Sequence, residues 1–247
     1  MKIREITAKS ILSPSQVYDF ALNPYVGCQH NCVYCYAKFM KRFTNHQEKW
    51  GEFVDVKINA PELLLHEVKK KKIGRVWISG VCDPYQPLEK KYQITKRCLE
   101  ILVENGWPIT VQTKSPLVLR DIETLKRASD LEVGFTITTA DEGIRTIFEP
   151  GAPPSSARIE ALASLRKEGI RTFAMVAPIL PGAEGLVGQL HGKVDNVLLD
   201  KLNYHYADWA YKRHGLQWAL EEGFFKQKGE ELRTAFEREG IPCQILF

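Results

Sequence analysis

Residues 23–37, NPYVGCQHNCVYCYA, place three cysteines, Cys28, Cys32 and Cys35, close together in the chain. Their spacing is Cys-x3-Cys-x2-Cys, and Tyr34 stands directly before the third cysteine. Soft thiolates at this spacing can wrap one compact metal cluster. A 4Fe-4S cluster normally takes four cysteine ligands, so three cysteines in one loop leave one iron with an open coordination site. An open site of this kind permits cofactor or substrate chemistry.

The composition is that of an ordinary folded protein. The chain has 247 residues, of which 44% are hydrophobic and 26% are charged, and such a length still suits one α/β domain. The amino terminus, MKIREITAKS, is charged where a secretory signal would be apolar, and no segment has the roughly 20 apolar residues of a membrane span. We therefore expect a cytoplasmic protein without a membrane partner. In that reducing compartment, clustered cysteines more often bind metal than form disulfides.

The positive charge is concentrated in the part of the chain that carries the cysteines. Residues 1–100 contain 17 Lys and Arg against 10 Asp and Glu, a net charge of +7, and the remainder carries −3 of the total of +4. This asymmetry suits a polyanionic partner such as nucleic acid. A solvated basic surface without a partner is the alternative.

Short apolar runs alternate with helical patterns after the cysteine segment, as in repeated β-α units with a parallel sheet. The expected strands are 18–25, 75–79, 108–113, 132–138, 171–177 and 196–199. The expected helices are 61–71, 93–105, 117–128, 156–168 and 209–221. In a parallel barrel the functional groups gather at the carboxyl ends of the strands. Asp83, Lys114 and Thr138 each lie at such an end and are candidate site residues.

These motifs together resemble the radical S-adenosylmethionine (SAM) superfamily, and within it the spore photoproduct lyase-like group, also described as DNA repair photolyase-like. The cysteine spacing with Tyr34 matches the signature loop of the superfamily, and residues 78–89, ISGVCDPYQPLE, are similar to the "TDPYQPxE" stretch of the group. The resemblance implies a partial (β/α)6 TIM-like barrel of the radical SAM type. It also implies a core domain over residues 1–200 with an N-terminal extension, and a C-terminal helical tail over 201–247 packed on the barrel.

The resemblance also implies the cofactors. Cys28, Cys32 and Cys35 would bind a 4Fe-4S cluster whose open iron chelates SAM. Reductive cleavage would then give a 5'-deoxyadenosyl radical that abstracts hydrogen from a substrate, with electrons from a reductase or from a flavodoxin or ferredoxin. Tyr34 occupies the aromatic position of the signature loop and is expected among the SAM contacts.

The same resemblance assigns roles to the residues at the strand ends. Asp83 would accept the amino group of SAM, Lys114 would contact its carboxylate, and Thr138 would contact the ribose or the carboxylate. The alternatives are a turn at Asp83, a solvated loop lysine and a strand threonine.

The substrate stays open, with nucleic acid as a candidate, and the catalytic residues stay unassigned. True lyases of the group use a cysteine hydrogen donor whose place aligns near Gly80, whereas this chain has Cys82 beside Asp83. Aromatic residues between 204 and 218 could stack on bases or cover the end of the barrel.

Two other classes of protein would also account for the cysteines. One is a nucleic-acid-binding protein with a structural or redox-sensing iron-sulfur cluster, which would bind with strong salt dependence and would not cleave SAM. The other is a zinc-stabilised module that uses the cysteines and His30 or a distant ligand.

Overall fold

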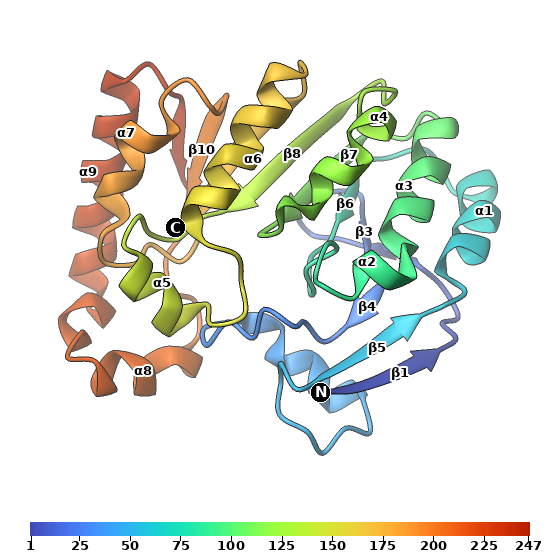
Figure 1. Cartoon of the computed structure of the whole chain (residues 1–247), viewed down its shortest axis with the longest axis horizontal. Helices are drawn as coiled ribbons and strands as arrows, with labels where there is room; N and C mark the ends of the chain where they lie inside the picture. The colour runs from blue at the N-terminus through green and yellow to red at the C-terminus, as the bar shows by residue number, and fades with distance from the viewer.

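The computed structural model describes residues 1–247 and is built on an eight-stranded sheet with the order β11-β10-β9-β8-β7-β6-β3-β2 (Figure 1). Seven neighbouring strands run parallel. Six of them are β3 (Phe20–Leu22), β6 (Val76–Ile78), β7 (Ile109–Thr113), β8 (Leu131–Thr136), β9 (Arg171–Val176) and β10 (Asn196–Leu199), and the seventh is the edge strand β11. At the edges, β2 (Leu12–Pro14) is antiparallel to β3 and β11 (Cys243–Ile245) is parallel to β10. The edges stay apart, so the α/β fold is a partial barrel, as expected.

Helices connect successive parallel strands. They are α1 (Ala60–Lys70), α2 (Glu89–Tyr92), α3 (Ile94–Glu104), α4 (Ile122–Leu125), α5 (Glu142–Phe148), α6 (Ser155–Lys167), α7 (Leu186–Leu190), α8 (Asp208–Arg213) and α9 (Glu222–Arg238), with the 3₁₀ helices η1 (Tyr36–Phe43), η2 (Pro116–Asp121), η3 (Ala183–Gly185), η4 (His205–Ala207) and η5 (Gln217–Leu220). The strands are rich in fully buried Val, Ile and Phe, as is typical of parallel strands covered by helices.

A second sheet lies at the end toward which the parallel strands point (Figure 1). Its order is β1-β5-β4, from β1 (Lys2–Ile6), β5 (Phe53–Lys57) and β4 (Tyr25–Val26). Trp50 and Phe53 pack there against Ala37 of η1 in a small apolar cluster separate from the main core. This sheet therefore supports the segment that follows the cysteines.

Three sequence predictions require correction. The expected strand 18–25 is two strands in different sheets, β3 and β4, because Asn23 and Pro24 interrupt it. The expected helix 117–128 is mostly the 3₁₀ helix η2 followed by the short α4. The expected helix 209–221 ends after α8, where Gly215 takes a positive φ of 70° that favours glycine.

The last part of the chain contains elements that the sequence patterns did not predict. Helix α9 packs against β11, and β11 pairs with β10 with Val197 opposite Cys243. Residues 201–247 thus add a strand to the sheet as well as helices. The division between a core of residues 1–200 and a tail stays a prediction. None of the helices is both long and apolar enough to cross a membrane.

Candidate active site

The three clustered cysteines lie in the loop between β4 and η1. Cys28 and Cys32 are buried, Cys35 is partly exposed, and all three are free thiols. Burial raises the pKa of the Cys32 thiol to about 12, and burial with the neighbouring Asp83 raises that of Cys28 well above its usual range. No three His, Cys, Asp or Glu side chains lie close enough together to bind a single metal ion. The donor chemistry of the loop, three free thiols close together in the chain, suits an iron-sulfur cluster.

The segment after β6 holds the cysteine loop from one side. His30 Nε2 lies 3.1 Å from Asp83 Oδ2. The backbone N–H of Gln29 donates to Gln86 Oε1 at 3.0 Å, and the backbone N–H of Leu88 donates to Gln29 Oε1 at 2.7 Å. These contacts join residues 29 and 30 of the cysteine loop to residues 83–88, which lie more than fifty positions later in the chain. We name residues 83–88 the first clamp.

Asp83 is the central residue of the first clamp. Its carboxylate accepts hydrogen bonds from the Tyr85 amide at 2.9 Å, from Thr113 Oγ1 at 2.7 Å and from the Lys114 amide at 2.7 Å, in addition to its contact with His30. Burial alone would raise the pKa of Asp83, but His30 and these hydrogen bonds lower it to about 2. Asp83 is thus a buried anion that joins the cysteine loop to the carboxyl end of β7.

The segment after α5 holds the cysteine loop from the other side, and Figure 1 shows it approaching that loop. The Val33 amide donates to Phe148 O at 2.9 Å, and the Gly151 amide donates to His30 O at 3.0 Å. A Cβ atom at Gly151 would lie 2.4 Å from Gln29 O, so only glycine allows this approach. We name residues 148–151 the second clamp.

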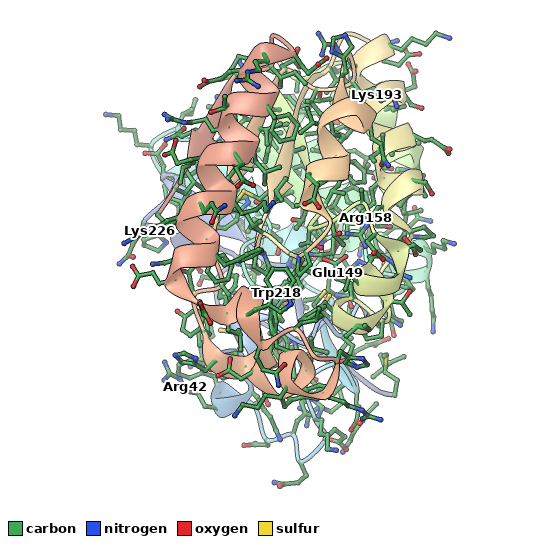
Figure 2. The ribbon with its side chains drawn as sticks, turned by 90° about the vertical axis from the view of Figure 1, so that its left-hand side faces the viewer. Arg42, Glu149, Arg158, Lys193, Trp218 and Lys226 are labelled. Atoms are coloured by element: carbon green, nitrogen blue, oxygen red, sulfur yellow. The ribbon has the colours of Figure 1, made fainter.

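Glu149 of the second clamp gathers three of the predicted site residues. Its carboxylate accepts hydrogen bonds from the Tyr34 hydroxyl and from Thr138 Oγ1, the latter at 3.3 Å, and lies 3.9 Å from Lys114 Nζ. Its other oxygen is 2.6 Å from Arg158 Nη2, and both of these side chains are fully buried (Figure 2). Burial would raise the pKa of Glu149, but the charges of Arg158 and Lys114 outweigh burial and lower it.

Lys114 places a positive charge beside the thiols. Its Nζ lies 5.7 Å from the centre of the Tyr34 ring, and its side chain is largely buried. Burial would lower the pKa of Lys114, but the neighbouring Cys32 and Glu149 raise it. The amine therefore stays charged at neutral pH and can balance negative charge on thiolates or on a bound carboxylate.

The predicted residues thus fall into two groups. Tyr34, Lys114 and Thr138 meet at Glu149, whereas Asp83 belongs to the first clamp. The sequence analysis missed Glu149 as a site residue. The signal available was an acidic residue before a proline in an otherwise apolar stretch, Phe148-Glu149-Pro150.

Cys82 lies next to the first clamp. Its sulfur is 3.0 Å from Ser79 Oγ, and burial raises the pKa of its thiol to about 11. Cys82 therefore carries a protonated thiol at neutral pH.

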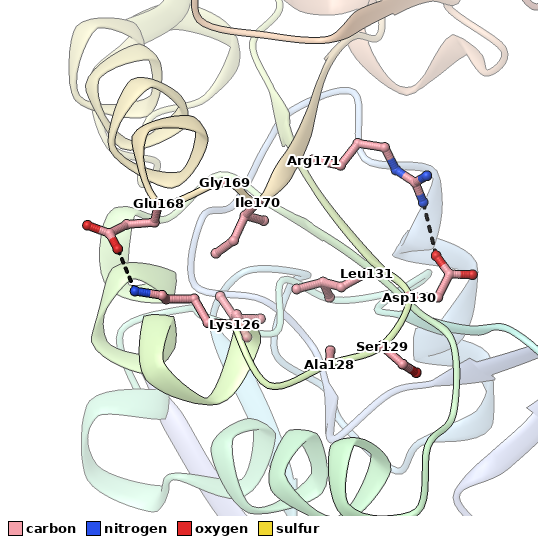
Figure 3. A pocket seen from close by; sticks show the side chains of 10 residues that line it. Lys126, Ala128, Ser129, Asp130, Leu131, Glu168, Gly169, Ile170 and Arg171 are labelled. Atoms are coloured by element: carbon pink, nitrogen blue, oxygen red, sulfur yellow. Dashed lines mark hydrogen bonds and ion pairs between the residues drawn. The ribbon is translucent and has the colours of Figure 1, made fainter.

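Two surface pockets differ in their position relative to the cysteines. One of about 550 Å³ adjoins the cysteine loop and both clamps, and its lining includes His30, Tyr85, Ser115 and Gly151. The other, of about 340 Å³, lies where β8 and β9 begin, between the ion pairs Lys126–Glu168 and Asp130–Arg171 (Figure 3). The second pocket is at the amino ends of the strands, away from the cysteines, so the first is the one associated with the site.

Comparison with known proteins gives consistent matches. Residues 22–184 match the family model of the radical SAM superfamily. An uncharacterized protein of Methanocaldococcus jannaschii is 38% identical over 184 residues, which cover 73% of this chain and 69% of that protein. A radical SAM Nalpha-GlyT isomerase of Pseudomonas phage M6 is 27% identical over 64% of this chain and 33% of its own length. Spore photoproduct lyase complexed with dinucleoside spore photoproduct superposes with a TM-score of 0.71 at 15% identity, covering 98% of this chain and 82% of the lyase. Uncharacterized proteins of Mycobacterium bovis and Mycobacterium tuberculosis are 29% identical over 171 residues, which cover 66% of this chain and 50% of those proteins.

Proposed function

This chain belongs to the radical SAM superfamily of enzymes, and we propose that it binds a 4Fe-4S cluster through Cys28, Cys32 and Cys35 and cleaves SAM reductively. The observation that carries the proposal is the position of the cysteine loop. It lies at the carboxyl edge of the parallel sheet, between two clamps, with the charged Lys114 beside Cys32. Functional groups of parallel α/β barrels gather at this edge.

When bound, the cluster and SAM would supply a 5'-deoxyadenosyl radical able to abstract a hydrogen atom. The contribution of the protein is to fix the thiols and to provide charge and hydrogen-bonding groups around them. Lys114 is the proposed partner of the SAM carboxylate, because its amine is charged and largely buried. Tyr34 and Thr138 are proposed as further SAM contacts, oriented by their hydrogen bonds to Glu149.

The contact expected between Asp83 and the amino group of SAM stays a prediction. Three hydrogen-bond donors and the His30 ring already surround its carboxylate, so we propose that Asp83 also positions the loop. It does so by joining His30 to the backbone of Lys114. Removal of Asp83 would then displace ligands as well as weaken SAM binding.

Nucleic acid is the proposed substrate class. The structurally similar lyase is complexed with a dinucleoside photoproduct, and residues 1–100 of this chain carry a net charge of +7, from 17 basic and 10 acidic residues. A reductase or a small flavodoxin or ferredoxin is the proposed electron donor. The alternative function is nucleic-acid binding with a structural or redox-sensing cluster.

The test is anaerobic reconstitution of the full chain with iron and sulfide, followed by reduction with dithionite in the presence of SAM. Chromatography then measures 5'-deoxyadenosine. Cys32→Ala removes a proposed ligand, and Cys243→Ala, in the remote strand β11, is the matched cysteine control. We expect 5'-deoxyadenosine from the wild type and from Cys243→Ala, and none from Cys32→Ala.

Equal amounts of 5'-deoxyadenosine from Cys32→Ala and the wild type would contradict the ligand assignment. An intact and reducible wild-type cluster that gives no 5'-deoxyadenosine, with or without oligonucleotides, would favour the binding-protein alternative.

A further inference from the structure

Four aromatic rings form a continuous row on the surface next to the cysteine loop. The ring centres of Phe39 and Tyr36, both in η1, are 6.5 Å apart. Those of Tyr36 and Tyr204 are 6.3 Å apart, and those of Tyr204 and Tyr206 are 5.7 Å apart. The angles between neighbouring ring planes are 24°, 19° and 7°. These nearly parallel, offset rings come from two segments far apart in the chain. We name Phe39, Tyr36, Tyr204 and Tyr206 the aromatic ladder.

The ladder is accessible to a partner. The exposed fractions of Tyr36, Tyr204 and Tyr206 are 40%, 49% and 38%. Between a third and a half of each of these three side chains is therefore open to a partner. Tyr and Phe present rigid, flat surfaces that lose little conformational entropy on binding.

Positive side chains accompany the ladder. Lys38 Nζ lies 5.5 Å from the centre of the Tyr206 ring, and the Arg42 guanidinium lies 5.5 Å from that of Phe39. Helix η1 carries Lys38, Lys41 and Arg42 and no acidic residue. Asp208 is an acidic side chain near the other end of the ladder, where it pairs with His205. The charge balance along η1 therefore favours an anionic partner.

The ladder is continuous with the proposed active site. Tyr36 follows Cys35 directly, and its hydroxyl donates to Gly80 O, next to the first clamp. Lys38 Nζ donates to Val33 O at 2.6 Å inside the cysteine loop. A chain bound along the ladder would therefore lie beside the reactive end of the sheet.

We propose that the aromatic ladder binds unpaired nucleic acid, with bases stacked on the exposed rings and phosphates near Lys38 and Arg42. Single strands are bound in this way by rows of aromatics interleaved with cations. This inference rests on the proposed function, because the proposed function identifies the cysteine loop as the active site. The ladder would guide an unpaired segment of substrate to the cysteine loop.

The test measures fluorescence anisotropy of a labelled oligothymidine of about 12 nucleotides against the reconstituted full chain, kept anaerobic. A second probe is an abasic oligomer with the same number of phosphates, which separates stacking from charge. The double variant Tyr204→Ala/Tyr206→Ala removes two rings of the ladder, and Tyr204→Phe/Tyr206→Phe keeps the rings without their hydroxyls. Trp218→Ala is the matched control, because Trp218 is 53% exposed and its ring packs against Phe224 and not against a ladder ring.

We expect the alanine pair to weaken oligothymidine binding about 10-fold or more, because each stacked base contributes substantially to affinity. The Kd of the phenylalanine pair and of Trp218→Ala for oligothymidine should stay within about two-fold of the wild-type Kd. The abasic oligomer should bind the wild type about 10-fold more weakly than oligothymidine does. Equal circular dichroism spectra and Tm values for the alanine pair and the phenylalanine pair would show that the alanine result does not come from unfolding.

Charge is tested separately. Arg42→Gln should reduce the slope of log K against log salt concentration by about 0.7, as expected for one phosphate contact on a single strand. Lys226→Gln, which alters an exposed lysine paired with Glu222 on α9, should leave the slope unchanged.

Equal binding of oligothymidine by the wild type and the alanine pair, or equal binding of the abasic and thymidine oligomers, would overturn the ladder proposal. Tighter binding of a proline-rich peptide or an oligosaccharide than of oligothymidine would also overturn it. The formation of 5'-deoxyadenosine by the wild type is measured independently. If the ladder binds oligothymidine but no 5'-deoxyadenosine forms, the proposed function is rejected and the ladder proposal is supported. If 5'-deoxyadenosine forms but the ladder does not contribute to binding, the ladder proposal is rejected and the proposed function is supported.

Discussion

The buried ion pair between Glu149 and Arg158 provides the sharpest test of the site. Glu149→Gln removes the negative charge while keeping the size of the side chain and an oxygen acceptor for Tyr34. Arg158 would keep its hydrogen bonds to the carbonyls of Pro153 and Thr136. Its guanidinium is fully buried, however, and would lose the carboxylate that lies 2.6 Å away.

The expected loss of stability follows from this burial. Removal of one partner of a buried ion pair leaves an uncompensated charge and costs about 3–5 kcal/mol. Glutamine still offers an acceptor, so we expect the lower end, about 3 kcal/mol. For a chain of this length, 3 kcal/mol corresponds to a fall in Tm of about 6–12 °C.

The assay is thermal unfolding followed by circular dichroism, with urea unfolding as a second measure. Glu168→Gln is the matched control, since Glu168 pairs with Lys126 at 2.8 Å but both side chains are about 40% exposed, at 39% and 41%. An exposed pair contributes at most about 1 kcal/mol. If Glu149→Gln lowered Tm no more than Glu168→Gln, Glu149 would not be the buried anchor that the contacts indicate.

Two further predictions concern the clamps. The pKa of Asp83 falls on folding from its ordinary value of 3.8 to about 2, so the carboxylate should stabilise the fold by about 2 kcal/mol above pH 4 and lose that effect as the pH falls to about 2. The difference in unfolding free energy between wild type and Asp83→Asn, measured by urea unfolding at several pH values, should narrow across this window; a constant difference would reject the assignment. Gly151→Ala should lower both Tm and the iron retained after reconstitution, because the added Cβ would lie 2.4 Å from Gln29 O. Gly188→Ala in α7 is the control, because a Cβ atom there would meet no atom within 4 Å. It should leave the retained iron unchanged and should leave the free energy of unfolding unchanged or raise it by up to about 1 kcal/mol. Equal iron in the two variants would argue against the second clamp.

The features that the sequence predicted correctly are local. Five of the parallel strands, β6 to β10, were readable because apolar runs of strand length alternate with helical periodicity. The family was readable because three cysteines and Tyr34 stand at fixed short spacings. Errors arose where a short-range signal was ambiguous, as in residues 18–25, where one extended run is divided between two sheets by Asn23 and Pro24.

The connections within the site depend on long-range contacts. Tyr34 and Glu149 are 115 positions apart, and Thr113 and Asp83 are 30 apart, so no periodicity relates them. Glu149 reads as an ordinary acidic residue until the fold buries it against Arg158. Spacing along the chain could therefore bring the three cysteines together, because all three lie within one loop. Folding alone joins the clamps to that loop and places Tyr204 against Tyr36, because those contacts arise only when distant strand ends meet at one edge of the sheet.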